Sequence, residues 1–200
     1  MNENYLIPDG VGRAEIVRKR SRFIAEAVSV SSSEDARAKI KNKREEHPQC
    51  SHVVYAFISG DPHTEAGGMS DDGEPSGTAG KPVMDVVKGS GIFNVLVTVV
   101  RYFGGTKLGT GGLVSAYSES AKRAIDELPV VKFVCRTSFS IKVPYNLYEK
   151  VAMIIKGAGG KIEKKDFTDI IAITGTVPEP NLKSCNAELK NISEGNIFIQ

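Results

Sequence analysis

The segment 94–112, NVLVTVVRYFGGTKLGTGG, contains the pattern that decides the fold of the first part of the chain. Five of its first seven residues are valine or leucine, which is typical of a strand buried on both faces of a sheet. Five glycines follow between residues 104 and 112, and apolar side chains then recur at helical spacing up to Leu128. We therefore predict a buried strand over 94–101, a glycine-rich connection and a helix over 112–128.

Alternating apolar and polar residues, serine N-caps and helix-ending prolines predict the neighbouring elements. The first part of the chain is expected to contain antiparallel strands at 12–19 and 22–30, a polar helix ending near residue 46, a strand at 52–59, a long loop over 60–81 and a short helix over 82–88. A domain boundary is expected at Pro129, because proline cannot continue the preceding helix.

The second part is expected to contain strands at 131–143, 160–166, 169–176 and 195–200, with helices at 145–157 and 180–190. This βαββαβ order is that of a split-βαβ, ferredoxin-like sandwich. The sequence thus predicts an α+β protein with a first domain over 1–129 and a ferredoxin-like second domain over 130–200.

The composition is that of an ordinary folded protein: 200 residues, 40% hydrophobic and 25% charged. These values exclude the disordered, collagen-like and disulfide-rich secreted classes. The net charge is only +2, so a nucleic-acid interface must rest on local patches; residues 129–200 carry 10 basic against 7 acidic side chains. Three widely spaced cysteines indicate free thiols, and no stretch approaches the ~18 apolar residues of a membrane span. We expect a cytoplasmic protein with no membrane partner.

The loop 70–82, SDDGEPSGTAGKP, is the first segment that could carry chemistry. Asp71, Asp72 and Glu74 either bind a hard cation through oxygen or form a solvated acidic turn that satisfies local amides. The end of the loop, from Gly77 to Lys81, precedes a helix and suits an anion. It lacks the GxxxxGK[ST] spacing of a Walker A motif, which argues against nucleotide hydrolysis.

The segment 101–112 is the second candidate. Arg101 and Lys107 could neutralise phosphates, Tyr102 could stack on a base, and the glycines allow close backbone approach. The alternative is that the aromatic residues fill the core and the glycines serve a tight crossover. The GxGxxG spacing of a dinucleotide loop is absent.

Two further clusters of side chains could carry chemistry. The histidines and cysteine at 47, 50, 52 and 63 do not match a usual structural zinc pattern, so we assign no metal and no cofactor. The run 18–20, Arg-Lys-Arg, is predicted at the exposed tip of a hairpin. Such cations are either a solvated face or phosphate contacts.

Two long motifs taken together, residues 71–82 and 94–109, closely resemble the signature of the IMPACT family. Ser21-Arg22-Phe23 and His52 with its neighbours also resemble that family's pattern. The resemblance spans about residues 1–128, and the remainder is similar to the small C-terminal domain of bacterial members.

This resemblance implies a first domain with the fold of the second domain of a small-subunit ribosomal protein. It also implies a ferredoxin-like second domain similar to the C-terminal domain of elongation factor G. The pairing suggests an RNA or ribosome partner by fold analogy. Eukaryotic members restrain a stress-activated translation kinase. For this chain the resemblance implies translation-linked binding, but we do not expect a role in that kinase pathway.

Three functions remain in competition. The residues favour a non-enzymatic, translation-linked protein that contacts RNA or the ribosome. One alternative is a small-molecule or metal-assisted hydrolase that uses the loop 71–81 and His52. The other is a protein-binding module. The residues expected at a ligand or RNA site are Arg18, Lys19, Arg20, His52, Asp71, Asp72, Glu74, Gly77, Lys81, Arg101, Tyr102, Gly104, Gly105, Lys107 and Gly109, with no catalytic residue assigned.

Overall fold

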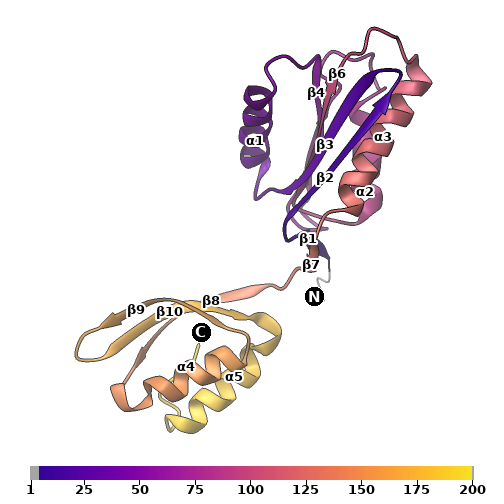
Figure 1. Cartoon of the computed structure of the whole chain (residues 1–200). Helices are drawn as coiled ribbons and strands as arrows, with labels where there is room; N and C mark the ends of the chain where they lie inside the picture. The colour runs from indigo at the N-terminus through magenta and orange to yellow at the C-terminus, as the bar shows by residue number, and fades with distance from the viewer. Residues whose placement is uncertain (1–4, 200) are drawn as a thin grey trace. The chain divides into compact units, whose positions relative to one another are not determined.

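The chain divides into two compact units of mixed α and β structure, seen in a computed structural model that describes residues 5–199 (Figure 1). The first unit extends to Phe133 and the second begins at Val134. Each has its own hydrophobic core of buried side chains. Each unit thus has a separate interior.

An antiparallel sheet of five strands forms the centre of the first unit, in the order β2-β3-β6-β4-β5. These strands are β2 (Val11–Arg18), β3 (Ser21–Ser29), β4 (His52–Ser59), β5 (Ala66–Ser70) and β6 (Val95–Tyr102). Helices α2 (Gly80–Ser90) and α3 (Thr110–Asp126) cover one face, and α1 (Ser33–Glu46) covers part of the other (Figure 1).

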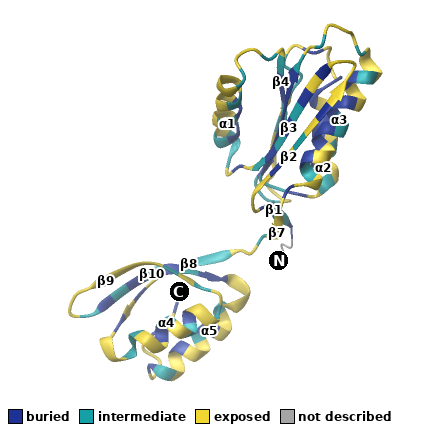
Figure 2. Cartoon of the chain, in the orientation of Figure 1, coloured by how far each residue is buried: buried dark blue, intermediate teal, exposed yellow. Residues whose placement is uncertain are grey.

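Strand β6 occupies the centre because it is apolar on both faces. Val95, Val97 and Val99 point into the core formed with α2 and α3, whereas Leu96 lies in the cluster beneath α1. The colouring of Figure 2 shows this burial along the central strands. The predicted buried strand, glycine-rich connection and following helix are therefore confirmed.

Two predictions for the first unit need correction. Part of the expected loop 60–81 is the edge strand β5, whose sequence AGGMS has little β propensity. A Cβ on Gly68 would lie 2.6 Å from the Phe57 ring, so glycine is needed for this pairing. Strand β7 (Val130–Lys132), expected in the second domain, pairs with β1 (Leu6–Pro8) and belongs to the first unit.

The second unit contains a three-stranded antiparallel sheet in the order β8-β10-β9. Strands β8 (Arg136–Val143), β9 (Lys161–Phe167) and β10 (Ile171–Pro178) carry helices α4 (Tyr148–Gly157) and α5 (Glu179–Ile192) on one face (Figure 1). A short 3₁₀ turn, η1 (Tyr145–Leu147), precedes α4. The order and type of these elements agree with the prediction up to α5.

The predicted strand over 195–200 is wrong as far as residue 199, where the described structure ends. The Asn186 amide accepts from the Ile199 backbone N–H at 2.7 Å and donates to the Ile199 carbonyl at 2.8 Å. Ile197 and Ile199 are buried in the core. Side-chain hydrogen bonds from α5 therefore replace the strand ladder that the apolar alternation predicted. No helix among residues 5–199 is long and apolar enough to cross a membrane.

We expect Gly12→Ala to destabilise the first unit by about 3 kcal/mol, within the usual range for overpacking. A Cβ at Gly12 would meet the Ala124 carbonyl oxygen at 2.0 Å, so strand β2 and helix α3 must separate. The matched control is Gly89→Ala in α2, where a Cβ meets nothing within 4 Å. This change should be neutral or stabilising by roughly 0.5–1 kcal/mol. Urea unfolding of both variants measures the difference, and equal stabilities would contradict the packing argument.

Candidate functional site

One row of residues crosses the sheet of the first unit where β3, β4 and β6 meet. Phe23 is opposite Arg101, and His52 is opposite Arg101 on the other side. Directly paired residues share a face, and Arg101 continues the inward alternation of Val97 and Val99. The row therefore faces the side of the sheet that α2 and α3 cover.

A buried ion pair joins the two motif segments at this row. The Arg101 guanidinium donates through Nη1 to Glu74 Oε1 at 2.5 Å, and the two side chains are only 6% and 4% exposed. Arg101 Nη2 donates to Ser21 Oγ at 3.3 Å. The guanidinium also lies about 5.4 Å and 5.5 Å from the ring centroids of Phe23 and Phe103. Arg101 thus ties β3, β6 and the loop after β5 together.

Glu74 is held by a second donor from α3. The Tyr117 hydroxyl donates to the same oxygen, Oε1, at 2.7 Å, and the Tyr117 ring packs edge-on against Phe23. Burial, together with the Glu74 hydrogen bond and charge, raises the pKa of the Tyr117 hydroxyl well above its ordinary value. Tyr117 therefore stays a neutral donor across the physiological pH range.

His52 lies at the rim of this cluster. Its Nδ1 is 2.7 Å from the Asp72 carbonyl oxygen, which can only accept, so Nδ1 carries the proton. Its Nε2 lies 3.7 Å from Glu74 Oε1. The imidazole is thus oriented by the backbone of the acidic loop.

Asp71 serves as the cap of helix α2. Its carboxylate accepts from the backbone amides of Gly77, Ala79 and Gly80 at 2.8, 3.0 and 2.8 Å. Burial raises the pKa of Asp71, but these three amide hydrogen bonds together hold it below its usual value. The anion predicted for the amides that precede this helix is therefore Asp71 of the same loop.

Asp72 is also engaged by protein groups. It accepts from the Val53 backbone amide at 2.6 Å and pairs with Arg44 of α1. Asp72 has a φ of 47°, which aspartate tolerates better than most residues. With Glu74 on Arg101, all three carboxylates of the acidic loop have partners from the chain itself. Across residues 5–199, no group of three or more His, Cys, Asp and Glu side chains is placed to hold a metal ion.

The two motif segments therefore converge, but their junction is closed and compensated in charge. Arg101 and Glu74 are withdrawn from solvent. The two segments meet at a buried ion pair and not at an exposed surface of cations. The predicted site residues that are exposed lie outside this junction, in the neighbouring turns.

The hairpin tip between β2 and β3 lies against the glycine-rich connection. A Cβ on Gly104 would lie 2.0 Å from the backbone of Arg20, and the Gly104 amide donates to Ser21 Oγ at 3.2 Å. Lys19, Arg20 and Lys107 are exposed and make no ion pair with any described residue. Phe103, which directly precedes Gly104 in the chain, is half exposed.

The remaining predicted residues have different roles. Arg18 pairs with Glu119 of α3 at 2.5 Å, and Lys81 pairs with Asp85 on α2. Tyr102 is on the opposite face, where its hydroxyl lies 2.8 Å from His47 Nδ1. The exposed glycines Gly77, Gly105 and Gly109 all adopt positive φ, which explains why glycine occupies these turns.

Two residues of the cluster were not predicted. In the sequence, Tyr117 belongs to the apolar face of the helix predicted over 112–128, and Ser21 belongs to the pattern that resembles the family. The hydroxyl of a tyrosine on a buried stripe needs a partner, and that requirement was the available signal. For Ser21, only the pairing of β3 with β6 brings its hydroxyl to Arg101 and Gly104.

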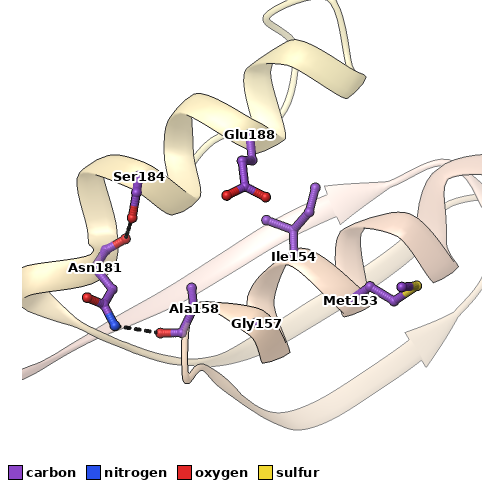
Figure 3. Close-up of a pocket in the computed structure, with 7 residues that line it drawn as sticks. All are labelled: Met153, Ile154, Gly157, Ala158, Asn181, Ser184 and Glu188. Atoms are coloured by element: carbon purple, nitrogen blue, oxygen red, sulfur yellow. Dashed lines mark hydrogen bonds between the residues drawn. The ribbon is translucent and has the colours of Figure 1, made fainter.

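A separate cavity of about 510 Å³ lies between α4 and α5 in the second unit (Figure 3). Ile154 of α4 and Ala158, the residue that follows this helix, line one side, and Ser184 and Glu188 line it from α5. The Asn181 amide donates to the Ala158 carbonyl across one end at 3.1 Å. The cavity contains one carboxylate, from Glu188, and has none of the motif residues.

The Impact N-terminal domain model matches residues 19–125, which include every residue of the buried cluster. The chain belongs to the IMPACT family. It is 33% identical over 98% of its length to the IMPACT family member YigZ of Escherichia coli, of which it covers 96%. It is 37% identical over 133 residues to the family member YvyE of Bacillus subtilis, a match to 66% of this chain and 60% of that protein. A crystal structure described only as that of a hypothetical protein matches 100% of this chain and 99% of its own, with a TM-score of 0.72 and 31% identity.

We expect Glu74→Gln to destabilise the first unit by about 3–5 kcal/mol, because the Arg101 guanidinium is left buried without a counter-charge. Arg101→Met should cost a similar amount by stranding Glu74. The double variant should lose less than the sum of the two single variants, because they remove the same interaction. Urea unfolding measures this cycle. Asp85→Asn, which breaks the exposed pair with Lys81, is the control and should cause no measurable loss; additivity of the buried pair would contradict this account.

The lowered pKa of Asp71 predicts an acid dependence of stability. The unfolded chain takes up the proton first, so the contribution of Asp71 is complete above its ordinary value of 3.8 and disappears as the pH falls through the lower folded value. Asp71→Asn removes this dependence. The stability difference between wild type and variant should therefore be constant from pH 7 to 5 and narrow below pH ~4. Unfolding curves at each pH test this, and a difference that widens in acid would contradict it.

Proposed function

We propose that this IMPACT family member is a non-enzymatic, translation-linked binding protein that contacts RNA, free or in the ribosome. The observation that carries the proposal is the exposed surface formed by the hairpin tip and the glycine-rich connection. Among residues 5–199, Lys19, Arg20 and Lys107 pair with no acidic side chain, and Phe103, which directly precedes Gly104 in the chain, is half exposed. Unpaired cations next to an exposed ring suit phosphates and an unstacked base.

The rigid cluster beneath this surface supports the proposal. Gly104 and the tip are fixed to each other through Ser21, and Ser21 is fixed to Arg101. A preformed arrangement loses little conformational entropy when a ligand binds. The buried pair thus has a positioning role, whereas the contacts would come from the turns.

The second unit offers a further basic surface. On the sheet face opposite α4 and α5, Ser140, Thr174 and Lys164 form one row, and the next row ends in Lys161. The excess of basic over acidic residues is also in residues 129–200, at 10 against 7. We include this face in the RNA footprint.

The finer fold assignments belong to the same proposal. The antiparallel order β8-β10-β9, with both helices on one face, fits three of the four strands of a ferredoxin-like sheet. The likeness of the first unit to the second domain of a small-subunit ribosomal protein rests on the family resemblance. Both assignments point to a translation partner by analogy of fold.

A hydrolase is less well supported by the arrangement of the acidic loop. Asp71, Asp72 and Glu74 already bind amides, Arg44, Arg101 and Tyr117, and a metal or substrate would have to displace them. We therefore propose binding and no reaction. The remaining competitor is a protein partner, which the experiment below separates from RNA.

RNA binding should weaken steeply as salt rises, and the triple variant Lys19→Asn, Arg20→Asn and Lys107→Gln should flatten that dependence. Asparagine is chosen because Lys19 and Arg20 have positive φ. Each lost phosphate contact lowers the slope of log K against log salt by ~0.7, so a change of about 2 is expected. Filter binding of a single-stranded RNA across salt concentrations measures the slopes.

The control is Lys41→Gln on α1, a highly exposed lysine away from the proposed surface. It should leave the slope unchanged. Binding that is absent or insensitive to salt contradicts the proposal. A lysate partner that is retained after nuclease treatment and released by the triple variant favours a protein-binding function instead.

A further inference from the structure

The two edges of the sheet in the second unit differ in how they are protected. Strand β9 forms one edge, and five of its seven residues are charged. Lysines and other charges along an edge oppose pairing with another strand. Strand β8 forms the other edge, and only Arg136 and Lys142 of its eight residues are charged. The β8 edge therefore lacks the protection that β9 has.

The chain's own C-terminal segment does not close the β8 edge. Residues 196–198 lie across a cavity of about 460 Å³ from residues 138–142 of β8. The Ile197 amide donates to Ser193 Oγ at 2.9 Å, and Ile199 is held on both sides of its backbone by Asn186. Within the described residues, β8 has a ladder partner only in β10. The position of a fourth strand is thus open along β8.

We propose that the β8 edge binds an extended peptide of a partner protein, which adds as a fourth strand to this sheet. Pairing of this kind takes affinity from main-chain hydrogen bonds and specificity from alternate side chains. The five residues 138–142 give an edge of about 17 Å at ~3.4 Å per residue. That length suits a peptide of five to seven residues.

The chemistry around the edge selects an acidic, partly apolar peptide. Lys142 is exposed, and no described carboxylate pairs with it. The acidic residue in the cross-strand row of Lys142 is Asp166, which lies two strands away on β9. Phe198, 40% exposed, provides an apolar contact on the far wall of the cavity. A peptide that alternates acidic and β-branched residues meets both features.

Two other strands that could occupy the β8 edge, from a second copy or from the chain's own C-terminal segment, fit less well than a partner peptide. Pairing of β8 with a second copy would bring two basic units together, each carrying 10 basic against 7 acidic residues over 129–200. Pairing with the chain's own residues 196–199 would break the Asn186 contacts and remove Ile197 and Ile199 from the core. The charge and packing therefore favour a separate acidic strand.

The test is a titration of the ¹⁵N-labelled full chain with an acetylated, amidated heptapeptide of alternating valine and glutamate. The amide signals of residues 138–142 and 196–198 should shift, and the lysine counterpart of the peptide should bind at least ~10-fold more weakly. Two further peptides carry N-methyl groups on alternate residues, in one register or the other. Only one of them should retain binding, because a strand presents alternate N–H groups to each neighbour.

Matched variants separate this edge from the rest of the sheet. Lys142→Glu should weaken binding of the glutamate peptide at least ~10-fold, whereas Lys164→Glu on β9 should change it less than twofold. The proposal is overturned by any of four results: no shift at millimolar peptide, shifts at the α4–α5 cavity instead, equal binding of both N-methylated peptides, or equal effects of the two variants. It is also overturned if sedimentation shows a dimer that Ser140→Lys dissociates, or if hydrogen exchange shows residues 197–199 paired with β8. RNA binding by the first unit is independent of all these outcomes.

Discussion

A guanidinium and a carboxylate, both almost fully buried, fix the register of the strands in the first unit. Removing two such charges from water costs several kcal/mol for each ion, and their attraction offsets this only when the geometry is good and the other polar atoms are satisfied. Arg101 and Glu74 meet most of that condition through Ser21, Tyr117 and the aromatic rings beside the guanidinium. Arg101 Nε, by contrast, is buried without a hydrogen-bond partner.

This pair makes the two long sequence motifs one structural feature. A strand slipped by one residue would turn Arg101 toward the α1 face and leave Glu74 without its cation. The cluster therefore specifies the register of β3, β6 and β4 together. The buried pair is better explained by the strand register that it specifies than by a gain in folding stability, because replacing buried ion pairs with apolar residues often costs little stability.

The sequence predicted the elements well where a single physical rule governs them. A nearly continuous apolar run predicted β6, and helical spacing predicted α3. The serine N-cap of α1 is confirmed by the hydrogen bond from the Asp35 amide to Ser32 Oγ. The prediction failed where a tertiary contact decides the outcome. Glycines conceal β5 because the Phe57 ring fills the space that a side chain at residue 68 would need. The last predicted strand does not form as far as residue 199, because Asn186 binds the backbone of Ile199.

For the site, the sequence identified the segments but not the direction of their side chains. Three carboxylates in four residues suggested an ion, because sequence does not show that three backbone amides surround Asp71 or that Arg44 reaches Asp72. Likewise, Arg101 was expected to neutralise phosphates together with Lys107, although its alternation with Val97 and Val99 along the strand already placed it on the core face. The residue type shows that Arg101 is charged, whereas its alternation with the inward-facing valines of the strand shows that it is buried.

Structural and exposed residues are separated in this chain. Arg101 and Glu74 maintain the shape of one end of the sheet, so the proposed contacts come from residues outside that cluster. In this chain those residues are the cations of the hairpin tip and, in the second unit, the composition of the two sheet edges. A β9 edge dense in charge and a β8 edge almost free of it are not both required by folding, because each strand is paired on its other side with β10. The asymmetry is thus better explained by what the β8 edge receives than by the stability of the sheet.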